Sequence, residues 1–152
     1  MIQRIQTLYL VVVTLLMALT LIFPIAEFHI QGVDFTLSAF NLSSAHVSYS
    51  TAWMGILLVL AIAVPLVTIF LFKRRTLQIR LCAVEAVLLL GVIVFIALYY
   101  WLANRMFEGF EIEHKQLGWA AIMPVLSLIL DVLAARAIFK DEVLVRSLDR
   151  IR

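Results

Sequence analysis

The chain has 152 residues, the length of one domain, but 64% of them are hydrophobic and only 14% are charged. Soluble domains are about half apolar and about a quarter charged, so this composition excludes an ordinary soluble domain and favours a protein that lies in a bilayer. The net charge of +2 is too small to indicate a nucleic-acid partner. With Cys82 as its single cysteine, the chain forms no internal disulfide bond.

Four apolar runs are each long enough to cross about 30 Å of hydrocarbon, which takes about 20 helical residues. They are residues 8–26, 52–72, 81–102 and 118–139. The first run resembles a signal peptide, but its core is long and no clear cleavage site follows it, so we expect an uncleaved helix. The sequence therefore predicts an all-α membrane protein, a single four-transmembrane-helix bundle with short connections.

Basic residues are concentrated at one end of this predicted bundle. Of the twelve Lys and Arg residues, all but Arg105 and Lys115 lie before the first run, between the second and third runs, or near the end of the fourth run and beyond it. This asymmetry predicts that both termini are cytoplasmic. The three tryptophans, Trp53, Trp101 and Trp119, lie at the opposite helix ends, where indole rings favour the headgroup zone.

The first outer segment, residues 27–50, begins with the pattern of a β-hairpin. Apolar and polar residues alternate on both sides of the turn Gln31-Gly32. The expected cross-strand pairs are Phe28 with Phe35, His29 with Asp34, and Ile30 with Val33. All the apolar side chains then lie on one face, which we expect to pack on the helix ends, since a lone hairpin is only marginally stable in water.

The remaining outer residues show no such pattern. Residues 39–50 are polar and rich in serine, which indicates a loop, and the second outer segment, residues 104–117, is short and acidic. The three histidines, His29, His46 and His114, have no ligand-like spacing, so no metal site is expected. No nucleophile motif, P-loop or dinucleotide fingerprint is present, and we expect no cofactor and no enzymatic activity.

The C-terminal residues 140–152 are predicted to continue the fourth helix, because no Gly or Pro follows Pro124. Leu144, Leu148 and Ile151 would form one apolar stripe on this tail. A basic amphipathic helix of this kind can lie on the anionic inner leaflet, or it can serve as a docking surface for a partner. The sequence favours neither use over the other.

Two acidic residues, Glu85 and Asp131, lie within the third and fourth runs. An ionised side chain at the bilayer centre costs about 2.5–3.5 kcal/mol, so such residues usually face inward and have partners. Arg80 and Arg136 lie near the same helix ends, and we expect the four residues to form a cluster in the cytoplasmic half of the bundle. Its favoured role is to lock the third and fourth helices in register. The alternative roles are proton or ion handling, or binding of a polar group.

Three segments of the chain, MIQRIQTLYL, KRRTLQIRLC and KDEVLVRSLDRIR, carry a likeness to a known family. Together they resemble the domain of unknown function family 4293, small four-helix inner-membrane proteins of Bacteroidota. The resemblance implies a bacterial inner-membrane protein with its outer segments, hairpin included, in the periplasm, and it supplies no activity. The charged residues on which it rests are expected to form a cytoplasmic docking surface, comprising Arg4, Arg74, Lys140, Asp141, Glu142, Arg146, Asp149 and Arg150.

Two functions follow as expectations. The first is a non-enzymatic accessory or scaffold subunit of a larger membrane-protein complex, which docks through its cytoplasmic face. The second is a small transporter or channel that uses Glu85 and Asp131. Because a single four-helix unit seldom encloses a pathway, the second function requires a homo-oligomer. An intramembrane enzyme that acts on lipid ranks below both.

Overall fold

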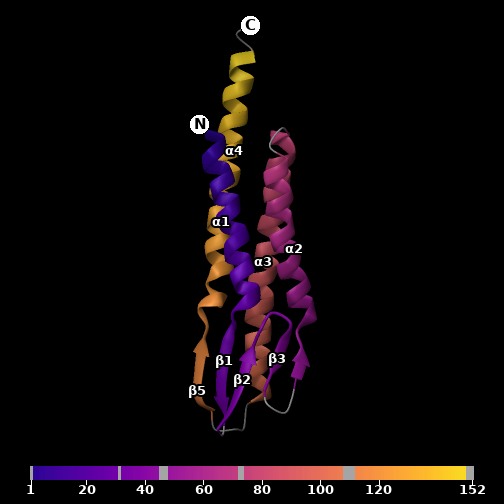
Figure 1. The fold of residues 1–152 in the computed structure, drawn as a ribbon, viewed down its shortest axis with the longest axis vertical. Helices are drawn as coiled ribbons and strands as arrows, with labels where there is room; N and C mark the ends of the chain where they lie inside the picture. The colour runs from indigo at the N-terminus through magenta and orange to yellow at the C-terminus, as the bar shows by residue number, and fades with distance from the viewer. Residues whose placement is uncertain (1, 31, 45–47, 72–73, 108–111, 150–152) are drawn as a thin grey trace.

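The structure is a computed structural model that describes residues 2–30, 32–44, 48–71, 74–107 and 112–149. In this part of the chain, the long helices are α1 (Ile2–Ile22), α2 (Ala52–Phe70), α3 (Arg75–Met106) and α4 (Met123–Asp149). Each helix contains a stretch long and apolar enough to cross a membrane. The helices run along the long axis of the molecule, and α1 and α3 each pack against both α2 and α4 (Figure 1).

The outward surface of the bundle is apolar, as a bilayer requires. Large aliphatic and aromatic side chains stay exposed along the middle of each helix, among them Leu15, Val59, Val87 and Ile129. In water, so large an apolar surface would cause aggregation, whereas lipid tails cover it without cost. The described helices therefore imply contact with a lipid bilayer.

A small antiparallel sheet covers one end of the bundle, which we call the sheet end (Figure 1). Its strands are β1 (Ala26–Ile30), β2 (Val33–Leu37), β3 (Asn41–Ser43), β4 (Ser48–Ser50) and β5 (Ile112–Leu117). Among the described residues their order is β4-β3-β2-β1-β5. The predicted hairpin is confirmed pair by pair, because Phe28 lies opposite Phe35, and His29 lies opposite Asp34. Gly32 supplies the positive φ, 75°, that the turn requires.

The sheet is larger than the predicted hairpin. The prediction of a plain loop for residues 39–50 was wrong, since β3 and β4 pair with each other and β3 pairs with β2. The second outer segment also contributes a strand, β5, which pairs along β1. These strands are short, or their partners are distant in sequence, so local alternation of apolar and polar residues did not reveal them.

Aromatic side chains join the sheet to the end of α3. The Phe28 ring lies 5.5 Å from that of Tyr100 and 5.8 Å from that of Phe107, between ring centroids. Phe35 of β2 lies 4.8 Å from Phe107. With 32 residues, α3 is about 48 Å long, which exceeds the roughly 30 Å of hydrocarbon, and the sheet packs against its last turns.

Candidate functional site

Two acidic side chains lie inside the bundle, one on each of the neighbouring helices α3 and α4. Glu85 and Asp131 each keep only 1% of their surface exposed. The buried positions of α3 recur every three or four residues, and Glu85 occupies one of them between Cys82 and Leu89. Asp131 has an equivalent place on the buried face of α4. Helical periodicity therefore turns both carboxyl groups toward the interior.

The helices α3 and α4 run in opposite directions (Figure 1). Their packing brings the two acids close together. The Cys82 thiol lies close enough to Asp131 for a side-chain hydrogen bond. Glu85 follows Cys82 by one helical turn and is near enough to Asp131 for the two carboxylates to repel each other. In an apolar interior such repulsion is stronger than in water.

Both arginines of the expected cluster stay outside this pair. The side chains of Arg80 and Arg136 are exposed. In the described residues, both Glu85 carboxyl oxygens and Oδ1 of Asp131 have no hydrogen-bond partner. A long arginine side chain can carry its charge toward the polar zone, which leaves the acids in the interior uncompensated. The structure thus describes a pair of buried acids, and the four-residue cluster with Arg80 and Arg136 stays a prediction.

A groove between α3 and α4 extends from Asp131 toward the end of the bundle opposite the sheet. We call that end the basic end, because Arg74, Arg80 and Lys140 lie there. The groove has a volume of about 420 Å³. Its walls are mostly apolar and are formed by Ile79, Cys82, Ala83, Ala86, Asp131, Val132, Ala135, Arg136 and Phe139. One of the two buried acids is thus part of a groove wall.

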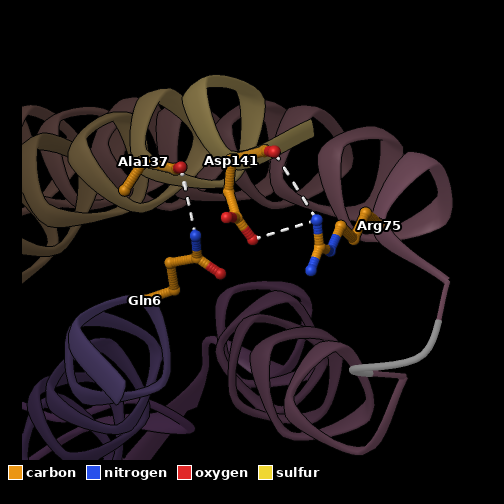
Figure 2. A network of polar contacts seen from close by, with 4 residues as sticks. All are labelled: Gln6, Arg75, Ala137 and Asp141. Atoms are coloured by element: carbon orange, nitrogen blue, oxygen red, sulfur yellow. Dashed lines mark hydrogen bonds and ion pairs between the residues drawn. The ribbon is translucent and has the colours of Figure 1, made fainter. Parts of the chain in front are cut away.

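Polar contacts join the helices at the basic end (Figure 2). The Gln6 side-chain amide of α1 donates a 3.1 Å hydrogen bond to the backbone oxygen of Ala137 on α4. Arg75 at the start of α3 forms an ion pair with Asp141 of α4, with 3.3 Å between Nη1 and Oδ2. The same Nη1 lies 3.5 Å from the backbone oxygen of Asp141. These contacts connect α4 to both of its neighbours.

A further contact connects α2 to α3, where the Gln78 side-chain amide donates a 3.0 Å hydrogen bond to the backbone oxygen of Thr68. Gln6, Gln78 and Asp141 all belong to the sequence segments that carry the family resemblance. Their contacts within the chain give these residues a structural use. Their presence in these segments is therefore not by itself a sign of a partner.

The remaining residues of the expected docking surface are spread over α1, the start of α3 and the end of α4. Arg74 and Lys140 are exposed, and Glu142 is half-buried. Arg74 and Glu142 line a groove of about 560 Å³ together with Arg75, Thr76, Leu77 and Val145. The backbone of Arg4, Arg146 and Asp149 is helical, but the structure does not describe their side chains. Arg150 lies outside the described residues.

The sheet brings two histidines together that are 85 positions apart in the sequence. His29 of β1 lies directly opposite His114 of β5, and its ring contacts the Asp34 carboxylate on β2. Sequence spacing did not reveal that His114 lies beside His29, because their proximity depends on the pairing of β5 with β1. Even so, no group of three metal-binding side chains is gathered among the described residues, and His46 lies outside them.

Comparison with known proteins gives a match over nearly the whole chain. The pattern of the family described as Domain of unknown function (DUF4293) matches residues 2–151. A search of curated proteins finds no match. The family match covers every helix and strand described above.

Proposed function

The chain belongs to the DUF4293 family, and on that premise we propose that it is a non-enzymatic accessory or scaffold subunit of a bacterial inner-membrane assembly. It docks to a partner through its cytoplasmic face, which we assign to the basic end. The observation that carries this proposal is the extension of α4 beyond the rest of the bundle. The concentration of Lys and Arg at the basic end supports the orientation.

The length of α4 requires one of its ends to leave the hydrocarbon. Its 27 residues span about 40 Å, against roughly 30 Å for the apolar core of a bilayer. The charged run of Lys140, Asp141 and Glu142 marks the boundary. Beyond it, Val143, Leu144 and Val145 remain 49%, 45% and 39% exposed. Apolar side chains outside the bilayer core gain stability when another surface covers them.

The direction of α4 favours a protein partner over the membrane surface. An amphipathic helix that binds the inner leaflet lies in the plane of the membrane. Figure 1 shows α4 continuing along the bundle axis, past the start of α1 and past the start of α3. Its exposed apolar residues are thus presented away from the bilayer, where a helix of a partner can pack against them.

Isolation of the native complex in a mild detergent tests this proposal. Wild type is compared with the double variant Leu144→Ser, Val145→Ser, and the copurified proteins are quantified by mass spectrometry. We expect one stoichiometric partner with wild type, reduced at least about tenfold in the double variant, because two partly buried aliphatic contacts are lost. Tyr49→Ser is the matched control, since it removes an exposed ring at the sheet end. Recovery of the chain only with itself, or equal partner recovery in all three proteins, contradicts docking.

The second candidate is an oligomeric transporter or channel that uses Glu85 and Asp131. The observation in its favour is that their buried carboxyl oxygens lack partners among the described residues. Reconstitution into vesicles, with ion flux followed by a fluorescent dye, tests it. We expect flux in wild type and none in Asp131→Asn if this candidate is correct. A stable, correctly assembled Asp131→Asn variant that keeps full flux contradicts it.

A further inference from the structure

In the described part of the chain, five buried side-chain oxygens on α3 and α4 have no hydrogen-bond partner; one is Oδ2 of Asp141 at the basic end, and the other four lie deeper in the bundle. These four are Oε1 and Oε2 of Glu85, Oδ1 of Asp131 and Oγ of Ser127. Ser127 has no exposed surface, and it lies on the same face of α4 as Asp131, one turn away. A buried polar atom without a partner is costly, and a buried carboxylate is more so. A ligand bound to these unpaired oxygens would remove that cost.

The register of the two helices places these oxygens at neighbouring levels. The contact between Cys82 and Asp131 aligns α3 with α4. One turn nearer the sheet end, α3 presents Glu85 and α4 presents Ser127, because the helices run in opposite directions. The four oxygens therefore come from two facing helices: two from Glu85 on α3, and one each from Ser127 and Asp131 on successive turns of α4. Such an arrangement gathers donors that are distant in the sequence.

The chemistry of the donors selects the ligand. Carboxylate and hydroxyl oxygens bind hard cations, and two carboxylates in an apolar interior need a positive charge between them. Ca²⁺ takes six to eight oxygens as a rule, more than these side chains offer. A proton shared by two carboxyl groups, or a Na⁺ ion held by the four oxygens, matches the set. We propose that Glu85, Asp131 and Ser127 form an intramembrane binding site for a small monovalent cation, H⁺ or Na⁺.

The surrounding helices do not supply the missing positive charge. The charged or titratable side chains nearest in sequence are Cys82 and the exposed Arg80 on α3, and the exposed Arg136 on α4. On α1 the titratable residues are Arg4, whose side chain lies outside the described set, and Tyr9, which is half-buried near the basic end. Between Ala52 and Phe70, α2 has none. A mobile cation is thus the available counter-charge.

The groove between α3 and α4 provides the route to this site. Asp131 lines it, and Arg136 and Phe139 extend it toward the basic end. Exchange of the cation therefore takes place from that side. The site deepens the second candidate function, whose Glu85 and Asp131 it uses. It is independent of the docking proposal, because it lies within the bundle and shares no residue with Val143, Leu144 or Val145. Failure of one proposal leaves the other intact.

Cation-dependent thermal stability of the purified protein in detergent tests the proposal. A ligand that binds only the folded state raises the unfolding midpoint as its concentration increases. Wild type is measured in NaCl and in choline chloride at equal ionic strength, across a series of pH values. If Na⁺ binds, we expect the midpoint to be higher in NaCl by roughly 3 °C or more. If the site takes H⁺ only, the midpoint rises as the pH falls, and Na⁺ has no effect beyond that of choline.

The variants Glu85→Gln and Asp131→Asn should lose this cation dependence, and Ser127→Ala should weaken the response to Na⁺ alone. Glu27→Gln is the matched control, because it removes an exposed acid at the sheet end and should keep the wild-type response. A wild-type midpoint that responds to neither Na⁺ nor pH overturns the proposal, even when a variant fails to fold. A response that persists in both Glu85→Gln and Asp131→Asn also overturns it.

Discussion

Arg75 at the start of α3 contacts Asp141 of α4 at two points, the carboxylate and the backbone oxygen (Figure 2). The carboxylate Oδ2 accepts no well-aligned hydrogen bond, so charge attraction dominates the side-chain contact. Asp141 lies where α4 leaves the bundle, directly before the exposed apolar residues of its tail. The ion pair therefore fixes the base of the segment that we propose to dock.

Removal of this ion pair should destabilise the protein modestly. The two side chains are 26% and 14% exposed, so solvent and salt screen part of the attraction. We expect Arg75→Ala to lower the free energy of unfolding by about 0.5–1 kcal/mol. A double-mutant cycle with Asp141→Asn should assign most of this loss to the interaction between Arg75 and Asp141. Thermal unfolding in detergent measures the effect. The control is Arg80→Ala, an exposed arginine on the same helix; an equal loss there would show that the pair itself contributes nothing.

Gly118 lies where β5 returns to the bundle, close to the backbone at the end of α1. A Cβ atom at this position would lie 2.5 Å from the backbone oxygen of Pro24, and the Gly118 amide donates to the Ile25 oxygen at 2.9 Å. Because the obstacle is backbone, we expect Gly118→Ala to cost about 1–3 kcal/mol, measured as a lower unfolding midpoint.

Gly91→Ala is the matched control for that substitution. Its Cβ would meet only the methyl groups of Leu57, at an ordinary 3.9 Å. Alanine is favoured over glycine in a helix interior by roughly 0.5–1 kcal/mol, so Gly91→Ala should leave stability unchanged or raise it. If both alanine variants change the unfolding midpoint alike, the close approach at Gly118 is not the cause of the change in stability.

The register of the hairpin and the closeness of Glu85 to Asp131 could both be derived from the periodicity of the sequence. Strict alternation around a Gln-Gly turn determines the register between Phe28 and Phe35, and counting turns from the helix ends places Glu85 near Asp131. The partners of β5 depend instead on tertiary packing, which local patterns do not encode. The place of the two arginine side chains could not be derived from the sequence, because reach alone does not determine the direction of a long side chain that gains hydration by turning outward.

The aromatic contacts predict that the sheet depends on Phe107. This ring is buried and packs against both Phe28 and Phe35. We expect Phe107→Ala to cost about 3–5 kcal/mol and to make the sheet end sensitive to protease in the folded protein. Phe70→Ala removes an exposed, lipid-facing ring and should change neither property. Wild-type protease resistance in Phe107→Ala would mean that the sheet is held by its strand pairing alone.

The assigned orientation predicts which ends of the molecule a membrane-impermeant thiol reagent can reach. In a Cys82→Ala background, cysteines are introduced singly at Ser48 on β4 and at Ser147 on α4, both of which are exposed. With the outer membrane permeabilised, Ser48→Cys should be labelled in intact cells, because the proposed orientation places the sheet end in the periplasm. Ser147→Cys should be labelled only after the inner membrane is broken. The opposite pattern would place the basic end in the periplasm. Docking through α4 would then require a periplasmic partner, and the cation site would exchange with the periplasm.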